Sequence, residues 1–290
     1  MPELPDIDVY IEQLDRRIRK QTLDNIRISN PFLVRSYDPP IGEAAGRRVA
    51  QLKRIGKRIA IKLDPDYWLI MHLMVAGRLH WHDDAVSIRG KQQLAAFDFS
   101  TGTLLLTEAG SKKRASLFLV RGDELLQEHD PGGIEPLECT LEDFSSRLTA
   151  ENRTMKRALT NPRSFSGIGN AYSDEILHAA RLSPVKLTGK LSDDEIARLY
   201  EATRSVLSAA RDRLRQDAGD DFPKKVTAFR PEMAVHGKFG QSCPDCGAPV
   251  ARIRYKSNET NYCPGCQTDG RIFADRSLSR LLKDDWPDTL

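Results

Sequence analysis

The sequence lacks long apolar runs, a signal peptide and any large excess of charge. It has 290 residues, of which 40% are hydrophobic and 7% aromatic, and its formal net charge is only +3. No stretch is long and apolar enough to span a membrane, and the N-terminal region lacks the apolar core of a secretory signal. We therefore expect a soluble, cytoplasmic protein with no membrane partner. The length favours two domains, or one domain with an appendage.

Cysteine is also scarce, and its distribution is uneven. Only five cysteines occur; Cys139 stands apart, and the other four are crowded near the C-terminal end. This crowding excludes the disulfide framework of a small secreted domain. The spacing Cys243-x2-Cys246-x16-Cys263-x2-Cys266 instead predicts a four-thiolate zinc site on a β-hairpin. Such a site is closed, so we expect one structural zinc ion; the module alone would serve a protein partner as well as DNA.

Basic residues form two clusters although the net charge is small. No acidic residue occurs between Glu43 and Asp64, a stretch that contains seven lysines and arginines, and Lys112, Lys113 and Arg114 are consecutive. Clusters of one sign indicate a polyanionic partner. A solvated basic surface is the alternative interpretation of either cluster.

The apolar pattern predicts an N-terminal helix, then short strands, then helices. Residues 5–19 have helical spacing, and several short alternating runs predict an antiparallel sandwich or barrel. The expected strands are 24–29, 47–55, 58–63, 68–74, 95–99, 103–107 and 116–120. After a Pro- and Gly-rich break at 130–136, helices are expected at 141–150, 154–161, 172–180 and 192–217, followed by a loop at 218–235 and a hairpin at 249–262.

The N-terminal sequence Met1-Pro2-Glu3-Leu4-Pro5-Asp6 has unusual chemistry. If Met1 is removed, Pro2 presents a secondary amine, and a free α-amino group titrates near pH ~8. The unprotonated amine can attack an electrophilic carbon and form an iminium, with the Glu3 carboxylate as an acid/base partner. Taken alone, this segment is better explained as a rigid lead-in to the helix.

Several motifs in one order resemble the formamidopyrimidine-DNA glycosylase and endonuclease VIII family of base-excision repair enzymes, and the resemblance covers nearly the whole chain. The matching motifs are PELPD at the start, RIGKRIAI around residue 57, MHLMVAGRL at 71–79, GGIEPL at 132–137, SFSGIGNAYSDEILHAARLSP at 164–184, VHGKFGQSCPDCG at 235–247 and YCPGCQ at 262–267.

The resemblance implies an α+β fold in three domains. These are an N-terminal helix on an antiparallel β-sandwich (1–130), a helix–two-turn–helix domain (138–222) and a zinc finger (236–275) with a tail at 276–290. It also implies a monomeric bifunctional DNA glycosylase and AP lyase of the bacterial cytoplasm and nucleoid. Such an enzyme excises oxidised bases, purines above all, from damaged double-stranded DNA through a proline Schiff base and nicks the strand by β/δ-elimination.

Site residues follow from the resemblance by position. Pro2 would be the nucleophile, Glu3 the proton donor, and Lys57 a contact to phosphate near the damaged nucleotide. Met74 would fill the gap left by an extruded base, and Asn170 would hold a backbone phosphate. From the residues alone, the last three would be an exposed strand lysine, a core methionine and a turn asparagine.

The sequence departs from the family pattern in four places. Asn258 occupies the position of the finger's phosphate-clamping arginine, which Arg254 or a neighbouring basic residue of the hairpin could replace. The usual Asp-Pro-Arg-Arg-Phe-Gly loop is Gly-Ser-Lys-Lys-Arg-Ala here, so Arg114 or Lys113 would be the wedge and the aromatic is absent. The loop that closes over an oxidised purine has no match between residues 215 and 230, and residues 268–290 extend past the finger.

These departures leave other functions open. Within the family, the chain could act on oxidised pyrimidines or mainly on abasic sites. It could also be a damaged-DNA-binding protein with little turnover, or a zinc-ribbon protein that binds protein partners.

The change Asn258→Arg tests the placement of the finger on DNA. An arginine holds a phosphate with two charge-assisted hydrogen bonds, whereas an asparagine offers one neutral contact. We expect tighter binding to every lesion duplex, a salt dependence steeper by about one unit of slope, and an unchanged lesion preference. Dissociation constants for two lesion duplexes at several salt concentrations measure this, and unchanged affinity and slope would contradict it.

Overall fold

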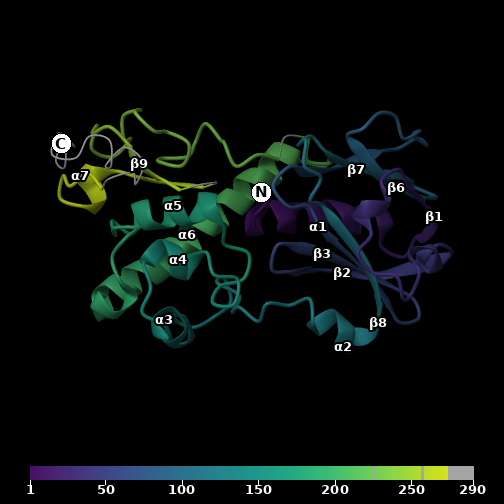
Figure 1. Cartoon of the computed structure of the whole chain (residues 1–290), viewed down its shortest axis with the longest axis horizontal. Helices are drawn as coiled ribbons and strands as arrows, with labels where there is room; N and C mark the ends of the chain where they lie inside the picture. Colours follow the sequence, from purple (N-terminus) through teal and green to yellow (C-terminus); the bar gives the residue numbers. More distant parts are fainter. Residues whose placement is uncertain (225, 256–257, 274–290) are drawn as a thin grey trace. The chain divides into compact units, whose positions relative to one another are not determined.

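The computed structural model describes residues 1–224, 226–255 and 258–273, which fall into two compact units (Figure 1). Unit 1 comprises residues 1–131 and 210–227, and unit 2 comprises residues 132–209 and the chain from residue 228 onward. The predicted domain limits stay predictions, and the tail at 276–290 lies outside the described residues. No helix in the described part of the chain is long and apolar enough to cross a membrane.

Unit 1 begins with the predicted helix, α1 (Leu4–Ile18). Glu3 is its N-cap residue, and the Glu3 backbone N–H donates to Asp6 Oδ2 at 2.9 Å. Pro5 lies in the first turn, where its missing N–H costs nothing. The apolar stripe of the helix is fully buried against the sheet and consists of Ile7, Tyr10, Leu14 and Ile18.

The sheet of unit 1 is antiparallel throughout, in the order β5-β7-β6-β1-β2-β3-β4-β8. Its strands are β1 (Thr22–Ile28), β2 (Arg47–Ile55), β3 (Arg58–Leu63), β4 (Tyr67–His72), β5 (Gly77–His82), β6 (Gln93–Phe99), β7 (Gly102–Glu108) and β8 (Ser116–Arg121). The two halves meet at a short β1–β2 pairing, where Leu23 opposes Arg47. All seven predicted strands occur, whereas β5 was missed and the strand expected at 68–74 ends at His72.

Both faces of the β3–β4–β8 half are covered. On one face, alternate residues such as Ile61, Leu69 and Leu117 join α1 in the main core. On the other face, Trp68 and Ile70 pack with residues of α2 (Gly122–Gln127), a helix that the sequence pattern did not predict. Strands buried on both faces lose the alternating pattern, which explains why these runs are almost continuously apolar.

The segment expected as a loop at 218–235 has no helix beyond Ala218 and no strand among its described residues. It is nevertheless anchored, because Phe222 and Val226 are buried in the main core of unit 1. The ring of Phe222 lies 5.5 Å from that of Tyr10 on α1.

Unit 2 contains the predicted helices and the hairpin. These are α3 (Leu141–Thr149), α4 (Met155–Leu159), α5 (Asn170–Ala179), α6 (Asp193–Ala218), β9 (Ala251–Arg254) and β10 (Glu259–Tyr262). A further short helix, α7 (Pro264–Gln267), follows the hairpin and was not predicted. The last residues of α6 belong to unit 1. α5 lies beside the β9–β10 hairpin (Figure 1), and its Asn170 Nδ2 donates to the backbone oxygen of Glu259 at 2.9 Å. The predicted α+β class, with a helical domain and a four-cysteine hairpin, is confirmed.

The turn between β4 and β5 tolerates no side chain at Gly77. A Cβ there would lie 2.2 Å from the backbone oxygen of Leu73, so Gly77→Ala must open the turn. We expect a loss of about 1–3 kcal/mol in the free energy of unfolding, measured by denaturant titration. Gly42→Ala is the matched control, because a Cβ there would meet nothing within 4 Å. Equal stabilities of the two variants would contradict this account of the turn.

Candidate active site and metal centre

The N-terminus of the chain is enclosed in unit 1. Pro2 is buried, and the side chains of Glu3 and Asp6 are exposed by only 2% and 4%. Burial lowers the pKa of the terminal amine, which is that of Met1 in this structure. The charges of Arg78 and Lys57 lower this pKa further, whereas the carboxylates of Glu3 and Asp6 oppose the shift. The amine therefore lies in the electrostatic field of two carboxylates and two positively charged side chains.

Lys57 lies in the two-residue turn that joins β2 and β3. Ile55 pairs with Arg58 across the turn, and Gly56 takes a positive φ of 56°, which a glycine accepts at no steric cost. His72 pairs with Arg58 on the next strand. Burial, reinforced by Arg58 and Lys57, lowers the pKa of His72 to about 4, so its imidazole is neutral at pH 7. The sequence interpretation missed His72 and Arg78, although both lie in the matched segment at 71–79.

Met74 lies in the tight turn between β4 and β5. Its φ is 52°, an uncommon conformation for a residue with a side chain. Met74 is half-buried, and the neighbouring Val75 is 58% exposed. The turn thus keeps two apolar side chains out of the main core, against the expectation from the residues alone that Met74 belongs to that core.

A buried carboxylate, which the sequence interpretation missed, organises the loop with the second basic cluster. Glu108 ends β7 and is 1% exposed. Its two carboxylate oxygens accept the Arg114 N–H at 3.0 and 2.9 Å, and one of them accepts the Ala115 N–H at 3.1 Å. The Lys113 ammonium donates to the Glu108 backbone oxygen. Lys113 is therefore half-buried and bound to the loop, whereas Arg114 is exposed.

In unit 2, the start of α5 and the tip of the hairpin share one hollow of about 370 Å³. Asn170, Asn258, Lys156, Arg157 and Tyr255 are among the residues that line it. Two predicted phosphate-contact residues, far apart in the sequence, are thus brought together. Arg254 does not line this hollow, because side chains alternate along a strand and its neighbours Ile253 and Tyr255 face it.

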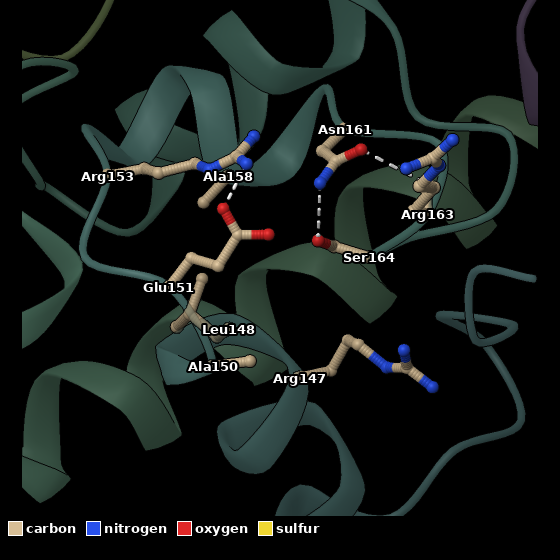
Figure 2. A pocket seen from close by; sticks show the side chains of 9 residues that line it. All are labelled: Arg147, Leu148, Ala150, Glu151, Arg153, Ala158, Asn161, Arg163 and Ser164. Atoms are coloured by element: carbon tan, nitrogen blue, oxygen red, sulfur yellow. Dashed lines mark hydrogen bonds and ion pairs between the residues drawn. The ribbon is translucent and has the colours of Figure 1, made fainter.

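A smaller hollow of about 110 Å³ lies beside α3 and α4 (Figure 2). Four of its polar side chains bind one another in pairs: Glu151 forms an ion pair with Arg153, and Asn161 Nδ2 donates to Ser164 Oγ at 3.0 Å. None of the residues predicted from the sequence as site residues lines it.

The four clustered cysteines form a candidate metal centre. Their sulfur atoms all lie within 4.8 Å of one another, with Cys243 Sγ 3.9 Å from Cys266 Sγ and Cys246 Sγ 3.3 Å from Cys263 Sγ. Four sulfurs about 2.3 Å from a tetrahedral zinc ion would be separated by similar distances, so the donor set fits zinc. Cys139 lies outside this cluster, and burial raises the pKa of its thiol.

Comparison with known proteins agrees with this architecture. Models of the formamidopyrimidine-DNA glycosylase N-terminal domain and of its H2TH domain match residues 1–112 and 133–217. The formamidopyrimidine-DNA glycosylase of Desulfitobacterium hafniense strain DCB-2 is 31% identical over 276 residues, covering 92% of this chain and 100% of the relative. A formamidopyrimidine-DNA glycosylase-like protein of Mycobacterium tuberculosis is 39% identical over 151 residues, covering 52% of this chain and 94% of the relative.

Solved structures extend the similarity to the whole fold. A complex of Lactococcus lactis Fpg with DNA containing an oxidised pyrimidine has a TM-score of 0.81 at 26% identity, covering 92% of this chain and 100% of that one. A complex of the same enzyme with abasic-site DNA has a TM-score of 0.80 at 25% identity, covering 92% and 99% of the two chains. The sheet, the helical domain and the cysteine hairpin together define a glycosylase-type architecture. The chain belongs to the formamidopyrimidine-DNA glycosylase family.

Removal of the Glu108 carboxylate should loosen the 109–115 loop. Glu108→Ala leaves the amides of Arg114 and Ala115 without their acceptor, at a cost of about 1–3 kcal/mol. We expect hydrogen exchange of these two amides to accelerate roughly 5- to 150-fold, as that range of free energy requires. Glu128→Ala, at an exposed position after α2, is the control and should leave both amides unchanged. Unchanged exchange in Glu108→Ala would contradict the role of the carboxylate.

Proposed function

We propose that this chain is a DNA glycosylase with AP lyase activity that excises oxidised bases, chiefly purines, from duplex DNA. Its family membership and the damaged DNA bound by the Lactococcus lactis relatives support this function. The observation that carries the proposal is the enclosed N-terminus, where Pro2 is buried next to the buried carboxylate of Glu3. Burial lowers the pKa of an amine, as it does for the Met1 amine of this structure, and leaves more of it unprotonated and nucleophilic at neutral pH.

The reaction begins with the extrusion of the damaged nucleotide, because its sugar is out of reach within the duplex. After removal of Met1, the Pro2 nitrogen forms a bond to C1′ as the glycosidic bond breaks, and the base leaves with the bonding electron pair and a proton. Glu3 protonates the ring oxygen, which opens the sugar and yields the iminium. The iminium acidifies the hydrogen on C2′. Loss of this hydrogen as a proton expels the 3′ phosphate by β-elimination, and δ-elimination can then release the 5′ phosphate.

Several side chains of unit 1 are suited to hold the damaged strand. Lys57 and Arg78 provide positive charge near the amine. The neutral His72 provides a hydrogen-bonding ring near the β2–β3 turn. We assign Met74 to the space left by the extruded base, since its turn keeps it half-exposed. Arg114 is the better wedge candidate than Lys113, whose ammonium is bound within its own loop.

The hollow in unit 2 is suited to a backbone phosphate. Asn170 lies at the start of a ten-residue helix, where the helix dipole favours an anion. Arg157 lines the same hollow and adds positive charge, Asn258 offers an amide, and the ammonium of Lys156 is already paired with the Asp174 carboxylate. Arg254 lies on the other face of the hairpin and would contribute only long-range attraction.

The metal in this function is one structural zinc ion held by the four clustered cysteines. A site closed by four thiolates folds and orders the hairpin that carries Asn258. The predicted three-domain division, with residues 1–130 as the catalytic domain, is retained as part of the proposal, as is a monomer acting in the bacterial cytoplasm at the nucleoid.

Trapping with borohydride tests the nucleophile. Reduction of the iminium fixes an amine-nucleophile enzyme covalently to its DNA, so the mature protein should become cross-linked to an abasic-site duplex. Pro2→Gly keeps an amine of different basicity and shape and should trap more weakly, and an uncleaved N-terminal tag should abolish trapping. The same tag at the C-terminus is the control, and intact mass establishes the loss of Met1.

Two results would redirect the proposal, and a further measurement defines the substrate. Trapping by a protein with a blocked N-terminus would assign the nucleophile to another residue. Tight binding of damaged duplexes without any trapping would identify a damaged-DNA-binding protein with little turnover. A panel of single-lesion duplexes separates oxidised purines from oxidised pyrimidines and abasic sites.

A further inference from the structure

Helix α5 carries a row of polar side chains that bind the finger segments. Asn170, Asp174 and His178 are spaced four residues apart and therefore share one face of the helix. Asn170 binds the backbone of β10, and Asp174 Oδ2 lies 2.7 Å from Nδ1 of His236, in the segment before the first cysteine. His178 is the last of the row and contacts Cys243, one of the four clustered cysteines.

The imidazole of His178 is buried against a cysteine. Its Nε2 lies 3.3 Å from Cys243 Sγ, and the two residues are only 4% and 2% exposed. Asp245 Oδ2 lies farther from the same nitrogen, at 3.9 Å, and its side chain is 46% exposed. A metal-bound thiolate can only accept a hydrogen bond. The Nε2 atom must therefore carry a hydrogen and donate a hydrogen bond to the sulfur.

The other sulfurs that receive hydrogen bonds obtain them from the finger's own backbone. Cys263 Sγ accepts the N–H of Cys266 at 3.4 Å, and Cys246 Sγ is bonded by the N–H of Ala248. Cys243 differs because its donor is a side chain of α5, 65 residues away in the sequence. A zinc ion with four thiolates carries two net negative charges, and each N–H donor withdraws part of that charge from a sulfur.

We propose that His178 is a positioning residue of the metal centre, whose Nε2–H donates to the Cys243 thiolate and fastens the metal-loaded loop to α5. The inference rests on the zinc ion of the proposed function and goes beyond it, because it adds a residue outside the four ligands. The bond makes the Cys243 sulfur a weaker electron donor and holds it in place for the metal. Helix α5, which presents Asn170 to the phosphate hollow at its other end, thereby becomes the support of the metal site.

Cobalt(II) substitution of the full chain tests the bond, because cobalt reports on its thiolate ligands through charge-transfer absorption. In His178→Phe, which keeps a planar ring but has no donor, we expect the charge-transfer bands to shift to lower energy. Metal affinity, measured by chelator competition, should fall about 10- to 100-fold. His178→Gln retains an N–H at a similar reach and should stay close to the wild type. Asp245→Asn is the control, because Asp245 lies farther from the His178 ring than Cys243 does. It should change neither the charge-transfer bands nor the metal affinity.

A second measurement needs no variant and remains decisive if His178→Phe fails to fold. In the cadmium-113 form of the wild type, an N–H···S hydrogen bond transmits a resolved coupling between the His178 Nε2–H and the metal nucleus. Absence of that coupling overturns the proposal, as do equal spectra and affinities of His178→Phe and His178→Gln. A cobalt spectrum of three sulfurs and one nitrogen would make His178 a ligand and overturn it too. Failure of the wild type to bind any metal would overturn the proposed zinc site as well, so the two failures are distinguishable.

Discussion

The buried carboxylate of Asp174 is the contact on which unit 2 depends. Its side chain is 0% exposed, and it forms an ion pair with Lys156 of α4. Its Oδ2 also lies at hydrogen-bonding distance, 2.7 Å, from Nδ1 of His236, in the segment that leads into the finger. A buried charge is tolerated only when it is paired, and removal of one partner typically costs about 3–5 kcal/mol. Three segments far apart in the sequence are thus held by one charge. Because Lys156 also lines the hollow that contains Asn170, the geometry of the proposed phosphate site depends on the same pair.

At the N-terminus of unit 1, the cost of desolvating a charged group has a different consequence. There the buried group is an amine, and burial favours its neutral, nucleophilic form. Glu3 links the proposed chemistry to the fold, since it is both the N-cap of α1 and a carboxylate close to the terminal amine. The apolar face of α1, anchored by Tyr10 and Leu14 in the main core, fixes the position of the helix start. Packing of the helix therefore determines where the N-terminus, the proposed nucleophile, lies.

Local patterns in the sequence predicted most of the elements and the four-cysteine cluster, because alternation, helical spacing and the pairs of cysteines are local signals. The strand β5 was overlooked although its residues alternate, with Leu79 and Trp81 on the core side between Arg78, His80 and His82. Glu108 and His178 were not predicted because their roles depend on tertiary contacts. A glutamate at a strand end resembles any surface acid until its buried hydrogen bonds are known. The grouping of Asn170 with Asn258 likewise requires the fold.

The loop at 109–115 departs from the family pattern, and its contacts support the wedge role that we propose for it. An aromatic wedge is rigid by itself, whereas a lysine- and arginine-rich loop needs an internal support to present one side chain. Glu108 supplies that support by accepting the amides of Arg114 and Ala115, and Lys113 closes the loop from within. Arg114 is left exposed on an ordered backbone. Because a guanidinium plane stacks on bases as well as binding phosphate, a supported arginine can replace an aromatic side chain in the space beside an extruded nucleotide.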